Sequence, residues 1–297
     1  MGENSLSGKI AIISILYKSD ELLEDFFQSL SLQKNANFTL FLLDNDANDT
    51  TKEIVYSLSD KYNLSNSVQY IECKDNSGFA RGNNIVLQEV LKNDFEYILL
   101  ANNDVFFTQA NLLSSLKDKC AISKVVTPQI LYYGTNEIWF SGGYINKYKG
   151  LNIHENEFKP ISEVKQDERF VEFAPACFLM VHKNIFEKIG LFDEKFFVYW
   201  EDVDFCVRIN NSGFKILLDP SLNIEHKVSV STGGRASLFS TYYFLRNRLY
   251  FIRKHFKGIE FLSSLFYTYL TSFAKILLYD MPRKKVIIKA VKDSKLM

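Results

Sequence analysis

The first hundred residues alternate between short apolar runs and longer segments in which apolar residues recur every three or four positions. Short runs rich in β-branched residues are typical of strands that are buried on both faces of a parallel sheet. The longer segments are typical of helices with one apolar face. The pattern predicts strands at residues 9–17, 38–43, 68–73 and 95–102, joined by helices. This alternation indicates βαβ units, and therefore an α/β fold with a Rossmann-like, mostly parallel sheet flanked by helices.

The starts of the first two helices carry residue types that commonly cap helices. Ser19 and Asp20 precede the first helix, and Thr50 and Glu53 have the spacing of a capping box at the second. We therefore expect their side chains to accept hydrogen bonds from the free backbone N–H groups there.

The rest of the chain has a different pattern. Residues 128–170 are irregular and predict loops and short strands. An apolar segment starting at residue 171, a helix at 183–189 and an apolar strand ending at His226 follow.

Composition narrows the class of protein. Of the 297 residues, 47% are apolar and 24% are charged, which is ordinary for a globular chain. The formal net charge is zero, so nothing in the overall charge points to nucleic acid. The four cysteines are far apart, which argues against a disulfide framework or a zinc site and favours a reducing cytoplasm. The start of the chain lacks the basic segment and cleavage site of a signal peptide.

Polar residues follow three of the predicted strands. Asp44, Asn76 and Asp104 fall at carboxyl ends, where open α/β sheets bind ligands, so we expect them to share one site. Asp44 could accept hydrogen bonds from a ribose or base, or could simply cap a helix. The segment NSGFARGNN, residues 76–84, places two glycines around a helix start, which suits a phosphate but also a tight turn.

Two further groups could carry chemistry. Asp104 follows Asn102 and Asn103, and a single carboxylate there could hold Mg²⁺ or Mn²⁺ together with diphosphate oxygens, although Asn and Asp also form turns. Glu201, Asp202 and Asp204 lie among aromatic residues, where desolvation and mutual repulsion raise the basicity of a carboxylate; the alternative is a solvated charged loop. His226 is a metal ligand or a structural histidine.

These pieces, in this order, resemble glycosyltransferase family 2, the inverting GT-A enzymes, and above all its rhamnosyltransferase-like branch. The resemblance covers about residues 9–250. It rests on LLDNDANDTT around Asp44, on NSGFARGNN, on Asn102-Asn103-Asp104 in place of a D-x-D motif, on the stretch that contains Glu201 and Asp202, on His226, and on Arg246-Asn247. Two departures stand out: Asn102 replaces the first acidic residue of D-x-D, and Pro175-Ala176 occupies a stretch where the family often has glycine.

The resemblance implies a GT-A catalytic domain over residues 1–250, with a nucleotide-binding half to about 105 and an acceptor half from 106, and a helical extension over 251–297. It implies a role for each matched residue. Asp202 would be the catalytic base and Glu201 would orient the acceptor or the base, while Asp104 and His226 would hold Mn²⁺ or Mg²⁺. The nucleotide sugar would contact Asp44, Asn76, Gly78, Phe79, Arg81, Asn84 and Asn103.

The implied reaction is transfer of a sugar, with inversion, from a dTDP- or UDP-sugar to a glycan or lipid-linked glycan acceptor of the bacterial cell surface. Rhamnose from dTDP-rhamnose is the first expectation. Two alternatives are open: a sugar nucleotidyltransferase, and a noncatalytic glycan-binding or scaffold protein on the same fold. The loop YKSDE after the first strand lacks the glycine-rich basic sequence of nucleotidyltransferases, and a noncatalytic protein would be expected to lose Asp104, Asp202 or His226.

The segment 259–279 is apolar and aromatic and lies between basic clusters. Its length approaches that of a bilayer span, but Glu260, Lys275 and many hydroxyl residues interrupt it. This composition favours a helix lying in the interface of an anionic membrane, on the cytoplasmic side. The alternative is a helix that packs on the catalytic domain or forms a dimer contact.

Overall fold

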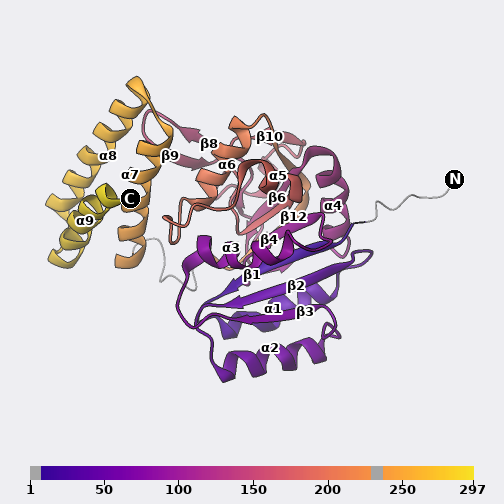
Figure 1. Ribbon diagram of the computed structural model, residues 1–297. Coiled ribbons are helices and arrows are strands. Elements are labelled where there is room, and N and C mark those ends of the chain that lie inside the picture. The colour runs from indigo at the N-terminus through magenta and orange to yellow at the C-terminus, as the bar shows by residue number, and fades with distance from the viewer. Residues whose placement is uncertain (1–7, 229–236) are drawn as a thin grey trace.

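The computed structural model describes residues 8–228 and 237–297. These form an α/β domain and a bundle of three long helices beside it (Figure 1).

The first half of the α/β domain has the predicted alternation. Its strands are β1 (Ile10–Leu16), β2 (Phe38–Asp44), β3 (Val68–Glu72) and β4 (Tyr97–Ala101), and its helices are α1 (Asp20–Ser31), α2 (Asp49–Lys61) and α3 (Gly78–Val90). The strands are parallel, in the order β3-β2-β1-β4. Helices cover the sheet, so the apolar runs become the core (Figure 1). The predicted fold class is confirmed.

The strand order reverses at β1, which has β2 on one side and β4 on the other. At such a switch point the connections leave toward opposite faces, and a crevice opens at the carboxyl ends of the strands. Asp44 ends β2, and Asn102-Asn103-Asp104 follows β4. The topology therefore brings these two polar groups to one edge of the sheet.

The second half extends the same sheet in mixed directions. β11 (Phe178–His182) runs antiparallel to both β4 and β6 (Val125–Tyr132), and β12 (Ile216–His226) runs parallel to β6. The shorter strands are β5 (Val105–Phe107), β7 (Ile138–Phe140), β8 (Gly143–Asn146), β9 (Leu151–His154) and β10 (Arg169–Val171). The helices are α4 (Leu112–Ser123), the turn η1 (Ile161–Glu163), α5 (Lys183–Ile189) and α6 (Glu201–Asn211). Strands β8 and β9 form a separate hairpin.

The helix starts differ from the capping prediction. Ser19 is at the N-cap of α1 without a side-chain cap, because its Oγ accepts a hydrogen bond from Asn103 Nδ2 at 2.6 Å instead. α2 begins at Asp49, and its N-cap is Asn48, whose side chain accepts from the N–H of Thr51. The capping box expected at Thr50 and Glu53 is therefore wrong by two residues.

The end of the chain is helical, as predicted: α7 (Leu238–His255), α8 (Gly258–Leu278), α9 (Met281–Asp293) and the turn η2 (Ser294–Leu296). The boundary expected at residue 250 falls inside α7. The inner face of α7 packs on the α/β domain, where Phe251 contacts Trp200, and the same helix packs against α8 and α9. α7 is thus shared between the α/β domain and the C-terminal helices.

Candidate active site

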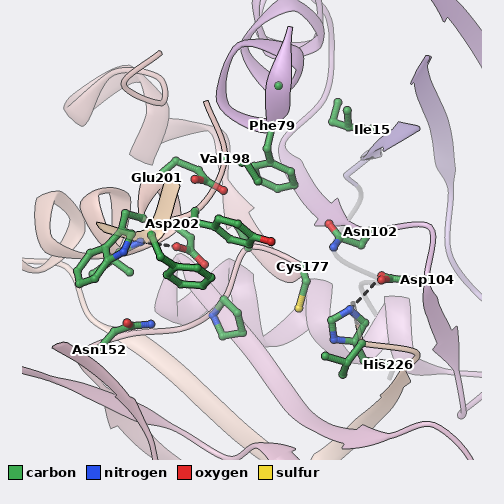
Figure 2. A pocket seen from close by; sticks show the side chains of 18 of the residues that line it. Ile15, Phe79, Asn102, Asp104, Asn152, Cys177, Val198, Glu201, Asp202 and His226 are labelled. Carbon is green, nitrogen blue, oxygen red and sulfur yellow. Dashed lines mark hydrogen bonds and ion pairs between the residues drawn. The ribbon is translucent and has the colours of Figure 1, made fainter. Parts of the chain in front are cut away.

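A cavity of about 810 Å³ opens at the carboxyl edge of the sheet. Figure 2 shows Asp104 and His226 on one side of it and Glu201 and Asp202 on the other. The switch-point loops, the β8–β9 hairpin, the segment before β11 and the start of α6 all contribute to its walls. Residues distant in the sequence therefore meet around a single space.

Main-chain pairing places Asp104 beside His226. β5 begins directly after Asp104 and pairs with the end of β12, so that Val105 lies opposite His226. Nε2 of His226 lies 3.0 Å from Oδ1 of Asp104 (Figure 2). Burial by itself raises the pKa of Asp104, but the charge of His226 together with hydrogen bonds from His226, from Asn102 and from the backbone outweighs this effect, so the pKa is lowered overall. Asp104 is therefore ionised at neutral pH.

These two side chains fit a divalent cation. Oδ1 of Asp104 and both ring nitrogens of His226 are buried without a properly oriented hydrogen-bond partner among the described residues. Buried polar atoms usually have a partner, and a carboxylate oxygen beside an imidazole nitrogen would gain one from Mn²⁺ or Mg²⁺. Over residues 8–228 and 237–297, no cluster of three or more His, Cys, Asp or Glu side chains forms a complete protein-only site. A metal here would thus need further ligands from diphosphate and water.

Glu201 and Asp202 form the first turn of α6. Burial, reinforced by the charge of Asp202, raises the pKa of Glu201 well above its usual range. Burial also raises the pKa of Asp202, to about 6, and backbone N–H groups of Val203 and Ala176 limit the rise. The rise favours the protonated form of Glu201, whereas Asp202 is mostly ionised at pH 7. Of the pair, Asp202 has the protonation state that a general base needs.

The start of α6 is held in a strained conformation. Tyr199 and Trp200 have φ angles of 66° and 76°, in the left-handed region, where a bulky residue costs about 1–2 kcal/mol. Asn247 of α7, which is fully buried, donates from Nδ2 to the carbonyl oxygens of Val198 and Tyr199, both at 2.8 Å. Its Oδ1 accepts from Arg246 Nε. Asn247 thus fixes the turn from which both carboxylates project, a role that the sequence motif alone did not reveal.

Asp204, the third acidic residue of this stretch, points away from the cavity. Its carboxylate accepts from His255 Nε2 at 2.7 Å, from Lys254 Nζ at 2.6 Å and from Arg208 Nε at 2.9 Å. Burial favours a higher pKa, but these three partners outweigh it and hold the pKa of Asp204 at about 2. Asp204 is therefore an anchor between α6 and α7 and is not a candidate base.

The NSGF segment borders the cavity through Asn76, Gly78 and Phe79. Gly78 has a φ of +71°, and a Cβ there would lie 2.3 Å from the carbonyl oxygen of Phe197. That oxygen accepts from the N–H of Phe79 at 2.7 Å. The absence of a side chain at Gly78 therefore allows two loops of the protein to pack closely. This agrees with the alternative that the glycine permits a tight turn, and it is a reason for a glycine here other than contact with a phosphate.

Asn45 and Trp139 are among the cavity residues that the sequence motifs did not predict. Asn45 is buried and joins the loop after β2 to the NSGF segment: it donates to Gly78 O and accepts from Ser77 N and Oγ. Trp139 packs its ring edge-to-face on His226, with centroids 4.7 Å apart. Asn45 could have been predicted, because it directly follows Asp44 at the end of a predicted strand. Trp139 could not, because it lies in the irregular region 128–170.

The other residues expected to bind nucleotide sugar divide into two groups. Asn103 lines the cavity, but Asp44, Arg81 and Asn84 are not among the residues that line it. The carboxylate of Asp44 accepts from the hydroxyl of Tyr70 and from the N–H of Asp46. Asn84 is buried and hydrogen-bonded on both sides to the main chain of Phe192, so its amide connects α3 to the loop between α5 and α6. Arg81 is exposed.

Comparisons with known proteins agree with this geometry. Residues 11–190 match the family described as glycosyl transferase family 2. The low-salt glycan biosynthesis hexosyltransferase Agl10 of Haloferax volcanii is 23% identical over 256 residues, covering 83% of this chain and 76% of that protein. The N-acetylglucosaminyl-diphospho-decaprenol L-rhamnosyltransferase of Mycobacterium tuberculosis is 34% identical over 91 residues, which is 29% of this chain and 30% of that protein.

The fold also matches solved structures. The mannosyltransferase PcManGT from Pyrobaculum calidifontis, in complex with GDP-Man and Mn²⁺, superimposes with a TM-score of 0.61 at 11% identity, over 97% of this chain and 81% of that chain. At this identity the likeness shows the fold alone. The family match spans more than half of the chain, from β1 to the end of α5. Together with the GT-A architecture, this match shows that the chain belongs to glycosyltransferase family 2.

Proposed function

We propose that this glycosyltransferase moves a hexose, with inversion, from a nucleotide diphosphate donor to a hydroxyl of a bacterial cell-surface polysaccharide or lipid-linked glycan. The observation that carries the proposal is the pairing of two opposed groups in one cavity. Asp104 and His226 lie where a diphosphate would be held, and Asp202 lies across from them with the ionisation of a base. A single displacement needs this arrangement, because the nucleophile and the leaving group occupy opposite sides of the anomeric carbon.

In the proposed reaction the acceptor hydroxyl attacks the anomeric carbon as the bond from that carbon to the diphosphate oxygen breaks. Asp202 takes the hydroxyl proton, and the bonding electrons leave with the diphosphate. General-base catalysis of this kind typically contributes about 10²–10⁴-fold. Burial raises the pKa of Glu201 and so favours its protonated form, which can donate a hydrogen bond to the acceptor and orient it.

Asp104 and His226 are the proposed ligands of Mn²⁺ or Mg²⁺. A divalent cation at this place supplies charge that stabilises the leaving diphosphate. Asn102, which stands where the family motif has an acidic residue, lines the cavity but brings no charge. Asp104 would accordingly be the carboxylate ligand on this side, and the donor and water would supply the remaining ligands.

The donor is proposed to lie along the switch-point loops, with the nucleoside towards Asp44 and the sugar beneath Phe79. Asn45, Asn76 and Asn103 supply amide groups along this path. Asp44, Arg81 and Asn84 would act from outside the cavity wall, Asp44 at the nucleoside end and Asn84 by supporting the segment. Rhamnose from dTDP-rhamnose is the first candidate sugar, in line with the rhamnosyltransferase relative, and UDP-hexoses are the second.

The alternatives are less well supported by the cavity. A noncatalytic glycan-binding protein would not need Asp104 and His226 on one side of the cavity and, on the other, an Asp202 whose pKa is raised to about 6. A nucleotidyltransferase would need a basic, glycine-rich loop after β1, where this chain has YKSDE.

A donor panel tests the proposal. The purified chain with Mn²⁺ is incubated with dTDP-rhamnose and with several UDP-hexoses, and nucleotide diphosphate release is measured with and without glycan acceptors. Release from one donor, stimulated by acceptor, is the expected result, and the anomeric configuration of the product by NMR decides inversion. Absence of release from every donor, with nucleotide binding intact, would favour the noncatalytic alternative.

We also propose a cytoplasmic location, with peripheral attachment to the inner face of the plasma membrane. The cysteines Cys73, Cys120, Cys177 and Cys206 are all free thiols, in keeping with a reducing compartment.

A further inference from the structure

The polarity of α8 is inverted relative to a helix of a soluble domain. Ser264, Thr268 and Ser272, spaced four residues apart, are its buried residues and face α7 and α9. Each hydroxyl donates to a carbonyl oxygen of α8 itself, so this face needs no water. Small side chains of this kind let helices approach closely.

The opposite face of α8 is apolar and exposed. Phe266 is 69% exposed and Leu277 is 65% exposed. The exposed apolar residues of this face are Ile259, Leu262, Phe266, Tyr269, Leu270, Phe273, Leu277 and Leu278. Their spacing of three and four positions makes them one continuous stripe, which we call the α8 face. Contiguous exposed apolar surface of this extent usually marks an interaction site.

Charge is also distributed unevenly between the C-terminal helices and the rest of the chain. From Arg246 to the end, the chain carries twelve Lys and Arg but three Asp and Glu. The preceding 245 residues carry 23 Lys and Arg against 32 Asp and Glu, so the zero net charge of the whole conceals a basic end and an acidic body. The cluster Arg283-Lys284-Lys285 lies at the start of α9, next to the end of the α8 face. A negatively charged surface would attract this end and repel the rest.

An anionic lipid surface fits these observations better than the other occupants. Among the described residues, α8 is the one helix long and apolar enough to span a bilayer, but it is packed through its hydroxyl face on α7 and on the strongly basic α9, which cannot enter hydrocarbon. A symmetric second copy would place the two basic ends against each other. We infer that the α8 face lies flat in the interface of an anionic bilayer, with the basic residues of α9 at the headgroups.

This orientation bears on the acceptor. α8 packs on the turn of the β8–β9 hairpin, where a Cβ on Gly150 would come within 3.2 Å of Ser264. The same hairpin lines the cavity through Asn152 and His154, and α7 contributes Phe239 and Phe244. Attachment through the α8 face therefore brings the acceptor side of the cavity near the lipid surface. This consequence rests on the proposed function, and the attachment itself does not.

Vesicle co-sedimentation of the full chain tests the attachment. With phosphatidylglycerol–phosphatidylcholine vesicles at about 0.05 M salt the chain should pellet, and raising the salt to about 0.5 M should release much of it. Pure phosphatidylcholine vesicles should bind less. Equal recovery in the supernatant under all three conditions would overturn the proposal.

Matched variants locate the contact. Phe266→Ser with Phe273→Ser should weaken binding to anionic vesicles about tenfold or more, because the apolar face drives insertion. Ile122→Ser with Phe170→Ser removes two apolar side chains of the α/β domain that are at least 63% exposed and should leave binding unchanged. Lys284→Gln with Lys285→Gln should weaken binding to anionic vesicles and reduce its salt dependence. Equal loss in the Ile122/Phe170 variant would overturn the assignment to α8.

Two further measurements distinguish a lipid surface from a second copy of the chain, and membrane attachment from the proposed sugar transfer. If Phe266→Ser with Phe273→Ser converts a dimer to a monomer in analytical ultracentrifugation without changing vesicle binding, the α8 face belongs to a second copy and the inference fails. Donor turnover with a water-soluble acceptor should be unchanged in this variant, since neither residue lines the cavity. Vesicle binding without turnover in the unaltered chain would refute the proposed function alone, and turnover without vesicle binding would refute this inference alone.

Discussion

Three acidic residues at the start of α6, Glu201, Asp202 and Asp204, have different electrostatic surroundings. Burial and the charge of Asp202 raise the pKa of Glu201. The hydrogen bond from His255 and the charges of Arg208 and Lys254 keep Asp204 ionised. Asp202 lines the cavity, and burial raises its pKa to about 6. Three carboxylates that look alike in the sequence therefore differ in pKa, because each has different neighbours in the folded chain.

The first prediction follows from this division. Asp202→Asn removes the proton acceptor and keeps the shape, so kcat should fall by about a hundredfold or more while donor affinity stays nearly unchanged. Turnover kinetics and donor titration measure the two quantities. An active Asp202→Asn enzyme together with an inactive Glu201→Gln or Asp204→Asn enzyme would refute the assignment, provided that the inactive variant is folded.

The second prediction concerns pH. A base with its pKa raised to about 6 is protonated and inactive below that pH and ionised above it. kcat should therefore rise between about pH 5 and pH 7 as a single deprotonation and then level off. A pH profile under saturating donor and acceptor measures it, with thermal stability followed at each pH as the control. A rate that is flat from pH 5 to pH 7 would contradict the prediction.

The third prediction concerns the metal. Asp104→Ala or His226→Ala should weaken activation by Mn²⁺ and lower nucleotide affinity, because each removes one proposed protein ligand. Titration of activity with Mn²⁺ and calorimetric nucleotide binding report the two effects. Full activity of the unaltered protein in excess EDTA would exclude a metal-dependent mechanism.

At the scale of elements, the turn before α6 depends on α7. Two left-handed residues together cost about 2–4 kcal/mol, and the two hydrogen bonds from Asn247 together contribute about 1–3 kcal/mol. The two quantities are comparable, so the strained turn persists only while α7 holds it. The position of the Glu201 and Asp202 carboxylates is thus set in part by a helix that begins 27 residues after α6 ends.

The fourth prediction tests this support. Asn247→Ala should let the turn relax and lower kcat by about tenfold or more with little change in donor KM, because Asn247 acts on the carboxylates and not on the donor. Asn210→Ala is the matched control, since Asn210 also donates to two carbonyl oxygens, of Glu172 and Cys206, but at the far end of α6. An equal kcat loss in both variants would indicate general destabilisation instead.

For the whole molecule, the C-terminal helices and the α/β domain depend on each other. Ile287 and Ala290 of α9 are buried, Tyr242 of α7 donates to Asp293, and Lys195 Nζ reaches the carbonyl oxygen of Met297 at 2.6 Å. These contacts tie the end of the chain both to α7 and to the loop that precedes α6. The helices after residue 257 are therefore part of the folded enzyme.

The fifth prediction follows. Truncation after residue 257 exposes the face of α7 that packs on α9 and should cost about 2 kcal/mol or more, which corresponds to a fall in Tm of about 4–8 °C. Turnover should also fall, because α7 carries Asn247. Differential scanning fluorimetry measures the shift, with Phe266→Ser/Phe273→Ser as the control that keeps α9 in place. An unchanged Tm and turnover would show that α8 and α9 are independent of the catalytic domain.

Local patterns in the sequence determined much of this protein. The four runs became the parallel strands. β1, β2 and β4 are buried, and a strand buried on both faces has to be apolar throughout. β3, at the edge of the sheet, is only partly buried and contains polar residues. The polar residues after β2 and β4 reached one edge, because parallel strands end on the same side. The apolar stretch 259–279 became a helix of the expected length.

Only the tertiary structure decided the rest. The side chain of Ser19 does not cap α1, because its Oγ accepts a hydrogen bond from Asn103, 84 positions away in the chain. Contacts between distant segments also determine three other features: the different pKa shifts of Glu201, Asp202 and Asp204, the close approach of Phe197 to Gly78, and the support of the turn before α6 by Asn247. The side of α8 that faces outward was equally invisible in the sequence, since hydroxyl and apolar residues alternate along it and only packing against α7 and α9 selects the hydroxyl face for burial. Local patterns report propensity and periodicity, whereas pKa values, strain and exposure arise from what the folded chain places around each residue.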